Sequence, residues 1–301
     1  MTIQRAEPLA RGVWGVVATP FTDGGEIDEH SLARLVGFYE SVGVTGLTVL
    51  GVFGEASALT ASEKRQVLRV VVDQSQLPIV AGITSLATGP AIAEIESAQA
   101  SVSDRLQAVM VQVNSGRPSV VIEHLRSLRE ATGAAVVLQD YPKSSGISIT
   151  TDNLVAVVEA CPFVSAVKAE APPTAVAIAR ITAELEISVF GGLGGQGLLD
   201  ELAAGSAGAM TGFSYPEALV GCVSAWFAGH REKARAELLP YLPLVNFEQQ
   251  PGIALAIRKE LFRRRGLFAS AAVRSPAMPF PSELTAITAN HLAEFDTSEV
   301  H

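Results

Sequence analysis

Lys168 offers the clearest chemistry in this chain of 301 residues. It lies in the apolar run Phe163-Val164-Ser165-Ala166-Val167-Lys168-Ala169-Glu170, which is typical of a fully covered β-strand, and amines are rarely buried without a purpose. An amine in an apolar pocket loses solvation of its charged form, so part of it is neutral near neutral pH and can attack a ketone carbon. The run therefore predicts a Schiff-base lysine.

Glu170 gives the same run a second interpretation. Because it follows Lys168 by two residues, both side chains lie on one face of a strand. The two can then neutralise each other as a buried ion pair with a purely structural role. Perturbed ionisable groups are enriched at active sites without being confined to them, so the strand alone leaves both interpretations open.

Eight short apolar, β-branched runs recur along the chain, with amphipathic segments between them. They are Val13–Ala18, Gly46–Leu50, Pro78–Gly82, Ala108–Val113, Ala135–Leu138, Val164–Lys168, Ile187–Phe190 and Ala207–Met210. Their spacing of about 20 to 35 residues fits a strand, a loop, a helix and a return loop, which predicts parallel strands with helical crossovers. Eight such units favour an α/β fold of the closed (β/α)8 TIM barrel type over an open doubly wound sheet.

The pattern changes after Met210, where no further strand is predicted. Helices are predicted at Pro216–Gly229, Arg231–Leu242, Gly252–Arg265 and Ser282–Phe295. We therefore expect a barrel over residues 1–220 and a C-terminal helical extension over residues 221–301. The extension is expected to pack on the barrel and to contribute to the contact of a homo-oligomer, either a dimer or a tetramer.

Composition and charge narrow the classes of function. Hydrophobic residues make up 48% of the chain, charged residues 18%, and the net charge is −9, which suits a well-buried enzyme and argues against nucleic acid as a partner. No uncharged apolar stretch is long enough for a membrane span, and the five histidines lack the spacing of a metal site. Cys161 and Cys222 are expected in the core, since two cysteines form no disulfide framework. We expect a cytoplasmic protein with no metal and no membrane contact.

The residues at the predicted strand ends carry a resemblance, because chemistry in a (β/α)8 barrel takes place at the C-terminal ends of the strands. Gly15 to Phe21, the motif Gly51-x-x-Gly-Glu55, a lysine ending the sixth strand, a glycine pair ending the seventh and a helical tail resemble the dihydrodipicolinate synthase and N-acetylneuraminate lyase family. The match covers essentially the whole chain. It implies a class I aldolase or hydro-lyase that acts without a cofactor on pyruvate or a longer 2-oxo acid, through an imine on Lys168.

Several positions depart from the pattern of family members that make dihydrodipicolinate. The paired threonines of those members align with Val52-Phe53, and their tyrosine pair aligns with Asn114-Ser115. Their catalytic tyrosine aligns with Gln139, and the arginine that binds a second carboxylate aligns with Ser144. The hydroxyl relay is therefore absent at these positions. Dihydrodipicolinate synthesis is not expected, although the resemblance still implies the fold and the imine.

Two other side chains can transfer protons to and from an imine on Lys168. Tyr141 lies two residues beyond Gln139, so strand alternation keeps it on the same face and nearer the barrel mouth; it either serves the imine or is a rim residue. Glu170 is either a general acid or base at the carbon next to the imine or only the counter-ion of Lys168. The candidate catalytic residues are thus Lys168, Tyr141 and Glu170.

The candidate substrate-binding residues also lie at strand ends. The backbone amides of Val52 and Phe53 can hold a carboxylate, as turn amides commonly do. The full set is Val52, Phe53, Gln139, Gly191, Gly192 and Thr211. The segment Gly192-Leu193-Gly194-Gly195-Gln196-Gly197 matches a dinucleotide-binding fingerprint, but that fingerprint normally opens a Rossmann unit and here follows the seventh strand of eight. A glycine loop that lets substrate approach the backbone is the favoured interpretation.

The strand-end residues favour a Schiff-base lyase for a 2-oxo-3-deoxy sugar acid or a similar hydroxylated 2-oxo acid. Polar side chains at Asn114, Gln139, Asp140 and Glu170 suit substrate hydroxyl groups. The alternatives are a dihydrodipicolinate synthase-like condensation of pyruvate with an aldehyde, a barrel that binds a 2-oxo acid without turnover, and a nicotinamide-dependent enzyme. Aldolase and dehydratase chemistry share one imine and one enamine, so the residues do not separate them.

Overall fold

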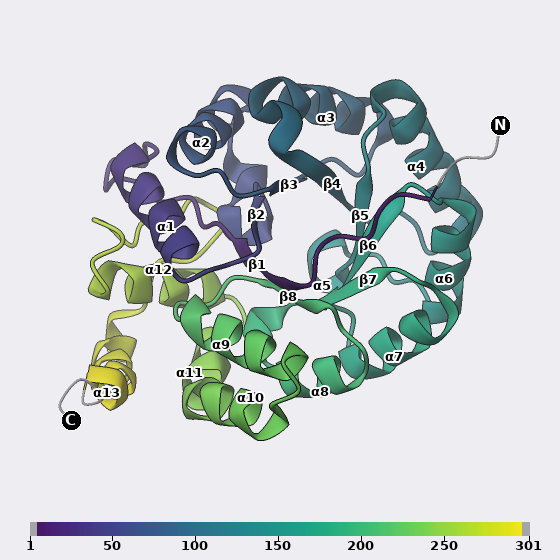
Figure 1. Ribbon diagram of the computed structural model, residues 1–301. Helices are drawn as coiled ribbons and strands as arrows, with labels where there is room; N and C mark the ends of the chain where they lie inside the picture. Colours follow the sequence, from purple (N-terminus) through teal and green to yellow (C-terminus); the bar gives the residue numbers. More distant parts are fainter. Residues whose placement is uncertain (1–4, 297–301) are drawn as a thin grey trace.

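The computed structural model of the protein describes residues 5–296 and confirms the predicted (β/α)8 barrel. Eight parallel strands close in the order β1-β2-β3-β4-β5-β6-β7-β8, and helices surround them (Figure 1). The strands are β1 (Gly12–Val16), β2 (Gly46–Val49), β3 (Ile79–Gly82), β4 (Leu106–Gln112), β5 (Val136–Asp140), β6 (Val164–Ala169), β7 (Ser188–Gly191) and β8 (Gly208–Thr211). The ends of the two predicted regions, residues 1–4 and 297–301, lie outside the described residues.

The helices alternate with the strands and then continue into the extension. Around the barrel lie α1 (Glu29–Ser41), α2 (Ala61–Gln74), α3 (Thr88–Val102), α4 (Pro118–Thr132), α5 (Pro142–Ser145), α6 (Thr151–Ala160), α7 (Thr174–Glu184), α8 (Leu198–Ala203) and α9 (Pro216–Phe227). The extension holds α10 (Arg231–Leu238), α11 (Leu242–Glu248), α12 (Ala254–Arg264) and α13 (Thr285–Asp296). Short 3₁₀ turns are η1 (Val52–Gly54), η2 (Ala56–Ala58), η3 (Ser103–Arg105), η4 (Leu193–Gly195), η5 (Leu239–Tyr241) and η6 (Ser282–Leu284).

The strands are apolar along their length because the barrel covers them on both faces. Every residue of β6 is buried, including Lys168, as the sequence predicts. Cys161 and Cys222 are buried too, and neither forms a disulfide. Among the described residues, no helix combines the length and the apolar character needed to cross a membrane.

The helical extension differs from the sequence prediction at one helix. The single helix predicted over residues 231–242 is wrong: α10 ends at Leu238, η5 follows, and α11 begins at Leu242. Pro240 explains the break, because proline has no N–H for the helical ladder and its ring clashes with the preceding turn. Helix α9 crosses the predicted boundary at residue 220 and packs on β1 and β8, so we propose that the barrel ends after α9.

Candidate active site

Strand register brings the polar side chains of the site into one row. Lys168 on β6 pairs with Gln139 on β5, and Gln139 pairs with Gln112 on β4. All three lie near the C-terminal ends of their strands, where the loops of a (β/α)8 barrel build active sites. Lys168 and Gln139 are 6% and 2% exposed, so an amine and an amide lie side by side in a largely dry environment.

Glu170 is the acceptor for three donors at this position. Its Oε2 atom lies 3.1 Å from Nζ of Lys168 and accepts a hydrogen bond of 2.6 Å from Nε2 of Gln139. Its Oε1 atom accepts a longer hydrogen bond of 3.4 Å from the backbone N–H of Leu193. Because Lys168 and Glu170 are both buried, their charges attract strongly, and the amide of Gln139 fixes the orientation of the carboxylate.

A cavity of about 170 Å³ opens over Lys168. The predicted site residues that line it are Val52, Phe53, Gln139, Tyr141, Lys168, Glu170 and Thr211. Thr211 accepts a hydrogen bond of 2.8 Å from the backbone N–H of Gly194, so it also anchors the loop after β7. The structure thus brings together the three candidate catalytic residues and four of the six candidate binding residues.

Gly191 and Gly192 do not line this cavity, because buried carboxyl groups occupy the space beside them. A Cβ atom added to Gly191 would lie 1.7 Å from Oε2 of Glu201, and one added to Gly192 would lie 2.1 Å from Oε1 of Glu170. The glycine pair therefore makes room for two carboxyl groups. Substrate binding by the pair stays a prediction, whereas the next residues, Leu193 and Gly194, do line the cavity.

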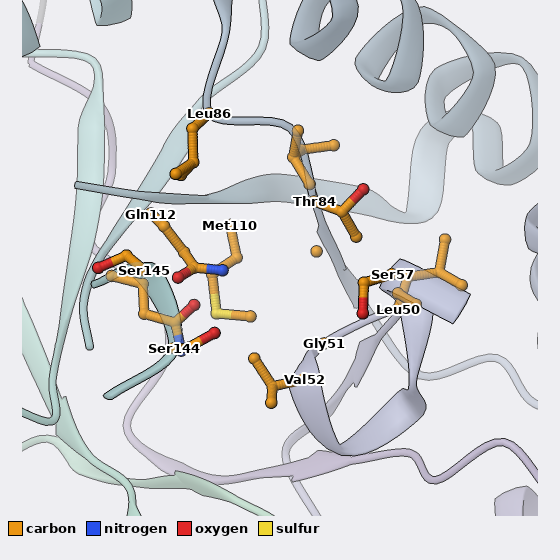
Figure 2. Close-up of a pocket in the computed structure, with 14 residues that line it drawn as sticks. Leu50, Gly51, Val52, Ser57, Thr84, Leu86, Met110, Gln112, Ser144 and Ser145 are labelled. Atoms are coloured by element: carbon orange, nitrogen blue, oxygen red, sulfur yellow. The ribbon is translucent and has the colours of Figure 1, made fainter. Parts of the chain in front are cut away.

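Figure 2 shows a second cavity, of about 200 Å³. It adjoins the first and shares Gly51, Val52 and Gln139 with it. No charged side chain is among the residues that line it. The polar lining residues are Ser57, Thr84, Gln112, Gln139, Ser144 and Ser145. Oε1 of Gln112 is buried and has no hydrogen-bond partner in the described structure, so an acceptor there is available to a ligand hydroxyl. Asn114 lines neither cavity and donates instead to the carbonyl oxygen of Leu86.

The loop from Gly51 to Glu55 is held by the helical extension. Glu55 adopts a left-handed backbone conformation (φ 52°) and ends the η1 turn that presents Val52 and Phe53. Its carboxylate binds Nζ of Lys259, a residue of α12 with no exposed surface, and accepts a hydrogen bond of 2.8 Å from the backbone N–H of Arg274. The glutamate of the Gly-x-x-Gly-Glu motif is therefore a positioning residue for the loop.

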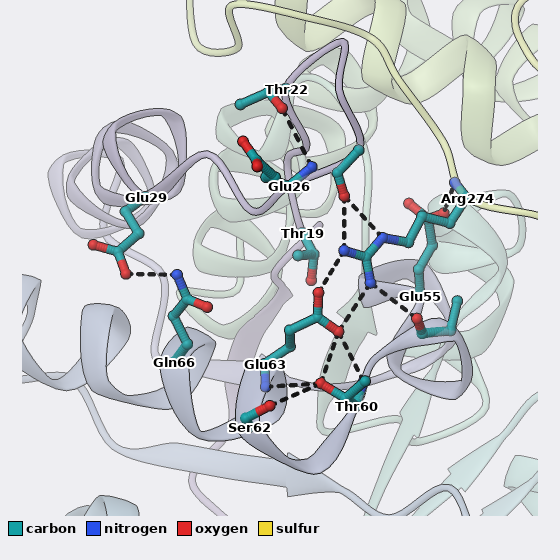
Figure 3. A network of polar contacts seen from close by, with 12 residues as sticks. Thr19, Thr22, Glu26, Glu29, Glu55, Thr60, Ser62, Glu63, Gln66 and Arg274 are labelled. Carbon is teal, nitrogen blue, oxygen red and sulfur yellow. Dashed lines mark hydrogen bonds and ion pairs between the residues drawn. The ribbon is translucent and has the colours of Figure 1, made fainter.

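Arg274 extends this network to helix α2 (Figure 3). Its guanidinium donates to both carboxylate oxygens of Glu63 and to the carbonyl oxygens of Gly25 and Ala58. Glu63 is also the third residue of α2, where its side chain and that of Thr60 form a capping box. One arginine from the extension thus ties the first turn of α2 to two barrel loops.

Burial and the charge of Glu170 shift the pKa values of Asp140 and Tyr141. Burial and repulsion from Glu170 raise the pKa of Asp140 to about 6. The same two causes raise the pKa of Tyr141 above its ordinary value, and Arg258 partly offsets them. Oδ1 of Asp140 is buried without a hydrogen-bond partner in the described residues, and Asp140 lines neither cavity. Tyr141 is therefore better placed to meet a ligand.

Arg258 and Gln249 are among the cavity residues that the sequence did not predict. Arg258 is 9% exposed, and its Nε atom lies 3.2 Å from Oε2 of the fully buried Glu248. Both come from the helical extension, where no strand-end rule applies. The only sequence signal was an arginine inside an otherwise apolar helical stretch, Ala254-Leu255-Ala256-Ile257-Arg258. In the described part of the chain, no cluster of three His, Cys, Asp or Glu side chains is arranged for a metal ion.

Comparisons with known proteins agree with the fold. The sequence profile of the Dihydrodipicolinate synthetase family matches residues 9–293. A 4-hydroxy-tetrahydrodipicolinate synthase from Methanothrix thermoacetophila is 29% identical over 91% of this chain and 93% of its own length. An L-2-keto-3-deoxyarabonate dehydratase from Azospirillum brasilense is 28% identical over 89% of both chains.

A solved structure gives the same assignment. The dihydrodipicolinate synthase from Rhodopseudomonas palustris superposes with a TM-score of 0.88 at 28% identity and covers 97% of this chain and 99% of its own. The profile match spans both the barrel and most of the extension. The chain therefore belongs to the dihydrodipicolinate synthetase family, and it is an enzyme of the class I, Schiff-base lyase type.

Proposed function

We propose that this enzyme is a lyase that removes water from a hydroxylated 2-oxo acid, such as a 2-oxo-3-deoxy sugar acid, through an imine on Lys168. The observation that carries the proposal is the buried amine of Lys168, 3.1 Å from the carboxylate of Glu170 in a cavity that adjoins a neutral, polar one. The amine supplies the nucleophile, the carboxylate supplies a base, and the neutral polar lining suits hydroxyl groups.

The reaction starts with addition of the Lys168 amine to the C2 carbonyl of the substrate. Loss of water gives a protonated imine, which keeps a positive charge beside Glu170. The carboxylate of Glu170 then takes a proton from C3, and the electron pair of that C–H bond forms the enamine. The C4 hydroxyl leaves as water with the proton from Glu170, and hydrolysis of the conjugated imine returns the amine and releases an unsaturated 2-oxo acid.

Gln139 favours loss of water over cleavage of the C3–C4 bond. Aldol cleavage needs a base that takes the proton of the C4 hydroxyl. The catalytic tyrosine of the family could be that base, but Gln139 stands at its position in this chain. An amide does not exchange a proton in the neutral range. Removal of a C3 proton needs only a carboxylate next to the imine, and Glu170 is there. The relative named as a keto-deoxyarabonate dehydratase supports the same assignment.

Borohydride trapping tests the proposal. Borohydride is added to the enzyme with pyruvate or with a 2-oxo-3-deoxy sugar acid. In each case one covalent ligand should be added to the enzyme, and peptide mass should place it on Lys168. Lys168→Ala should abolish labelling and lower turnover by several orders of magnitude, because no other nucleophile replaces the amine. Lys143→Met is the matched control, since Lys143 lines the same cavity from an exposed position.

Product analysis separates the alternatives. A product of the same carbon number, lighter by one water, supports dehydration, whereas pyruvate plus an aldehyde would mean aldol cleavage. Turnover of pyruvate with aspartate semialdehyde at about 10 per second would instead support a dihydrodipicolinate synthase-like condensation. Binding of 2-oxo acids with neither trapping nor turnover would reduce the chain to a binding barrel.

We also propose a cytoplasmic homo-oligomer, a dimer or a tetramer. Two observations support it: both cysteines are free thiols, and the extension exposes Leu239, Met278 and Ile287 by 40%, 53% and 45%. Exposed apolar side chains that gather into one patch mark contacts between subunits. Light scattering at working concentration should give a mass of two or four chains, and a monomer would contradict the proposal.

A further inference from the structure

Arg258 presents an unused cationic face to the Lys168 cavity. Oε2 of Glu248 lies 3.2 Å from its Nε atom as an ion pair without a hydrogen bond, and the ring of Phe53 lies 5.2 Å from its Cζ atom. Within the described residues, no acceptor forms a hydrogen bond with its terminal Nη1 and Nη2 atoms. A guanidinium that is fixed by two contacts and has free terminal donors is prepared to bind a carboxylate.

Gln249 brings a second donor to the same place. Its Nε2 atom is buried and has no hydrogen-bond partner in the described structure, and such groups call for an explanation. A Cβ atom added to Gly194 would lie 2.1 Å from Nε2 of Gln249 and 3.1 Å from Nη2 of Arg258. The two donors therefore converge beside the glycine, on a wall of the cavity that contains Lys168.

The converging donors are remote from the reacting carbon. Glu170, the ion-pair partner of Lys168, lies beside Gly192, whereas Arg258 lies beside Gly194. Residues two apart in a turn have Cα atoms on the order of 5–7 Å apart. The first carboxylate of a 2-oxo acid is bonded directly to the carbon that forms the imine, so it stays near Lys168. A group at Arg258 is thus roughly four or five bonds further along the substrate, given single bonds of about 1.5 Å.

We propose that Arg258 and Gln249 bind a second carboxylate at the far end of the substrate, which is therefore a hydroxylated 2-oxo diacid of about six carbons. The inference rests on the proposed function, since it takes Lys168 as the site of the imine. It also accounts for Ser144, which stands where the family has an arginine for a second carboxylate. Arg258 supplies that positive charge from the helical extension instead.

Binding of unreactive acids tests the inference without turnover. In the Lys168→Ala protein, calorimetry should show glutarate, a diacid, binding about 10- to 100-fold more tightly than butyrate, the monoacid of similar shape, as expected for one charge-assisted contact. Arg258→Gln should remove this difference, and Gln249→Leu should reduce it. Lys143→Met should leave most of the difference, because an exposed lysine is screened by solvent.

A paired variant separates binding from folding. Arg258→Gln leaves the buried Glu248 without its cation, so Glu248→Gln with Arg258→Gln is the neutral companion, and it should lose the preference for glutarate in the same way. Equal binding of glutarate and butyrate by the Lys168→Ala protein, or equal loss of both on Arg258→Gln, would overturn the inference. Borohydride trapping of pyruvate, which has a single carboxylate, should survive Arg258→Gln. The proposal of an imine on Lys168 and the proposal of a diacid site are therefore tested separately.

Discussion

At the scale of single residues, the two roles considered for Glu170 are compatible. Its carboxylate lies 3.1 Å from the amine of Lys168 and also lines the substrate cavity. A protonated imine carries the same charge as the ammonium that it replaces, so the ion pair survives the first chemical step. The carboxylate can then act as a base at the neighbouring carbon without first losing its partner.

Substitution of Glu170 and Tyr141 should identify the group that transfers the proton. Glu170→Gln is expected to lower kcat by about 10² to 10⁴, because a positioned acid or base contributes that factor, while borohydride trapping of pyruvate stays detectable. Tyr141→Phe should have a smaller effect if Glu170 carries the proton. Steady-state assays give kcat for both variants, and borohydride trapping shows whether each still forms the imine.

Other outcomes of this pair are equally informative. Near-normal kcat in both variants would contradict both candidates, and Asp140, with its pKa raised to about 6 by burial and by Glu170, would be substituted next. Loss of trapping and of folding together in Glu170→Gln would make Glu170 a structural partner of Lys168, because an unpaired buried ammonium costs about 3–5 kcal/mol.

At the scale of elements, the turn after β7 packs against two buried carboxyl groups, those of Glu201 and Glu170. Gly191 and Gly192 were predicted as substrate-binding residues, and the structure places the carboxyl groups of Glu201 and Glu170 against them. Glu201 is 1% exposed, accepts a hydrogen bond of 2.7 Å from Thr174, and has no partner for Oε2 in the described structure. A buried carboxyl group with one open oxygen is stable mainly as the neutral acid.

Glu201→Gln should stabilise the enzyme at alkaline pH. Burial, with a smaller contribution from Glu170 and Asp200, raises the pKa of Glu201 from 4.5 to about 7. A raised folded-state pKa gives stability that is complete below about pH 4.5 and is lost as the pH rises through about 7. The neutral amide keeps the contact with Thr174 and escapes this loss, so its free energy of unfolding at pH 8 should exceed that of the natural protein by about 2 kcal/mol.

Urea unfolding at pH 5 and pH 8 measures this effect. The difference should be several-fold smaller at pH 5, and Glu123→Gln, at an exposed position on α4, should change little at either pH. A gain of the same size at both pH values would mean that ionisation of Glu201 is not its cause.

The sequence predicted best where a single rule decides the structure. Short β-branched runs at regular spacing are typical of covered strands, so all eight strands and the position of Lys168 followed from the pattern. The helical extension was harder, because its packing depends on contacts far along the chain. Pro240 was overlooked inside a helical period, and Arg258 reaches the active site only through the path that α11 and α12 take.

At the scale of the whole molecule, a buried ion pair links the barrel to the extension. Lys259 on α12 has no exposed surface, binds the carboxylate of Glu55, and donates 2.9 Å to the carbonyl oxygen of Ala272. Burial lowers the pKa of Lys259 to about 8, and Glu55 opposes the shift. Since Glu55 also ends the turn that presents Val52 and Phe53, the extension shapes the cavity over Lys168 as well as covering the barrel.

A double-mutant cycle should measure this coupling. Glu55→Gln leaves a buried ammonium without its counter-charge, and Lys259→Met leaves a buried carboxylate, so each should lower the free energy of unfolding by about 3–5 kcal/mol. The double variant should lose less than the sum by about 2 kcal/mol or more, because neither charge is then stranded. Arg180→Met, which removes the exposed partner of Glu184 on α7, is the matched control and should cost at most about 0.5 kcal/mol. Additive losses in the cycle, measured by urea unfolding, would show that the two residues stabilise barrel and extension separately.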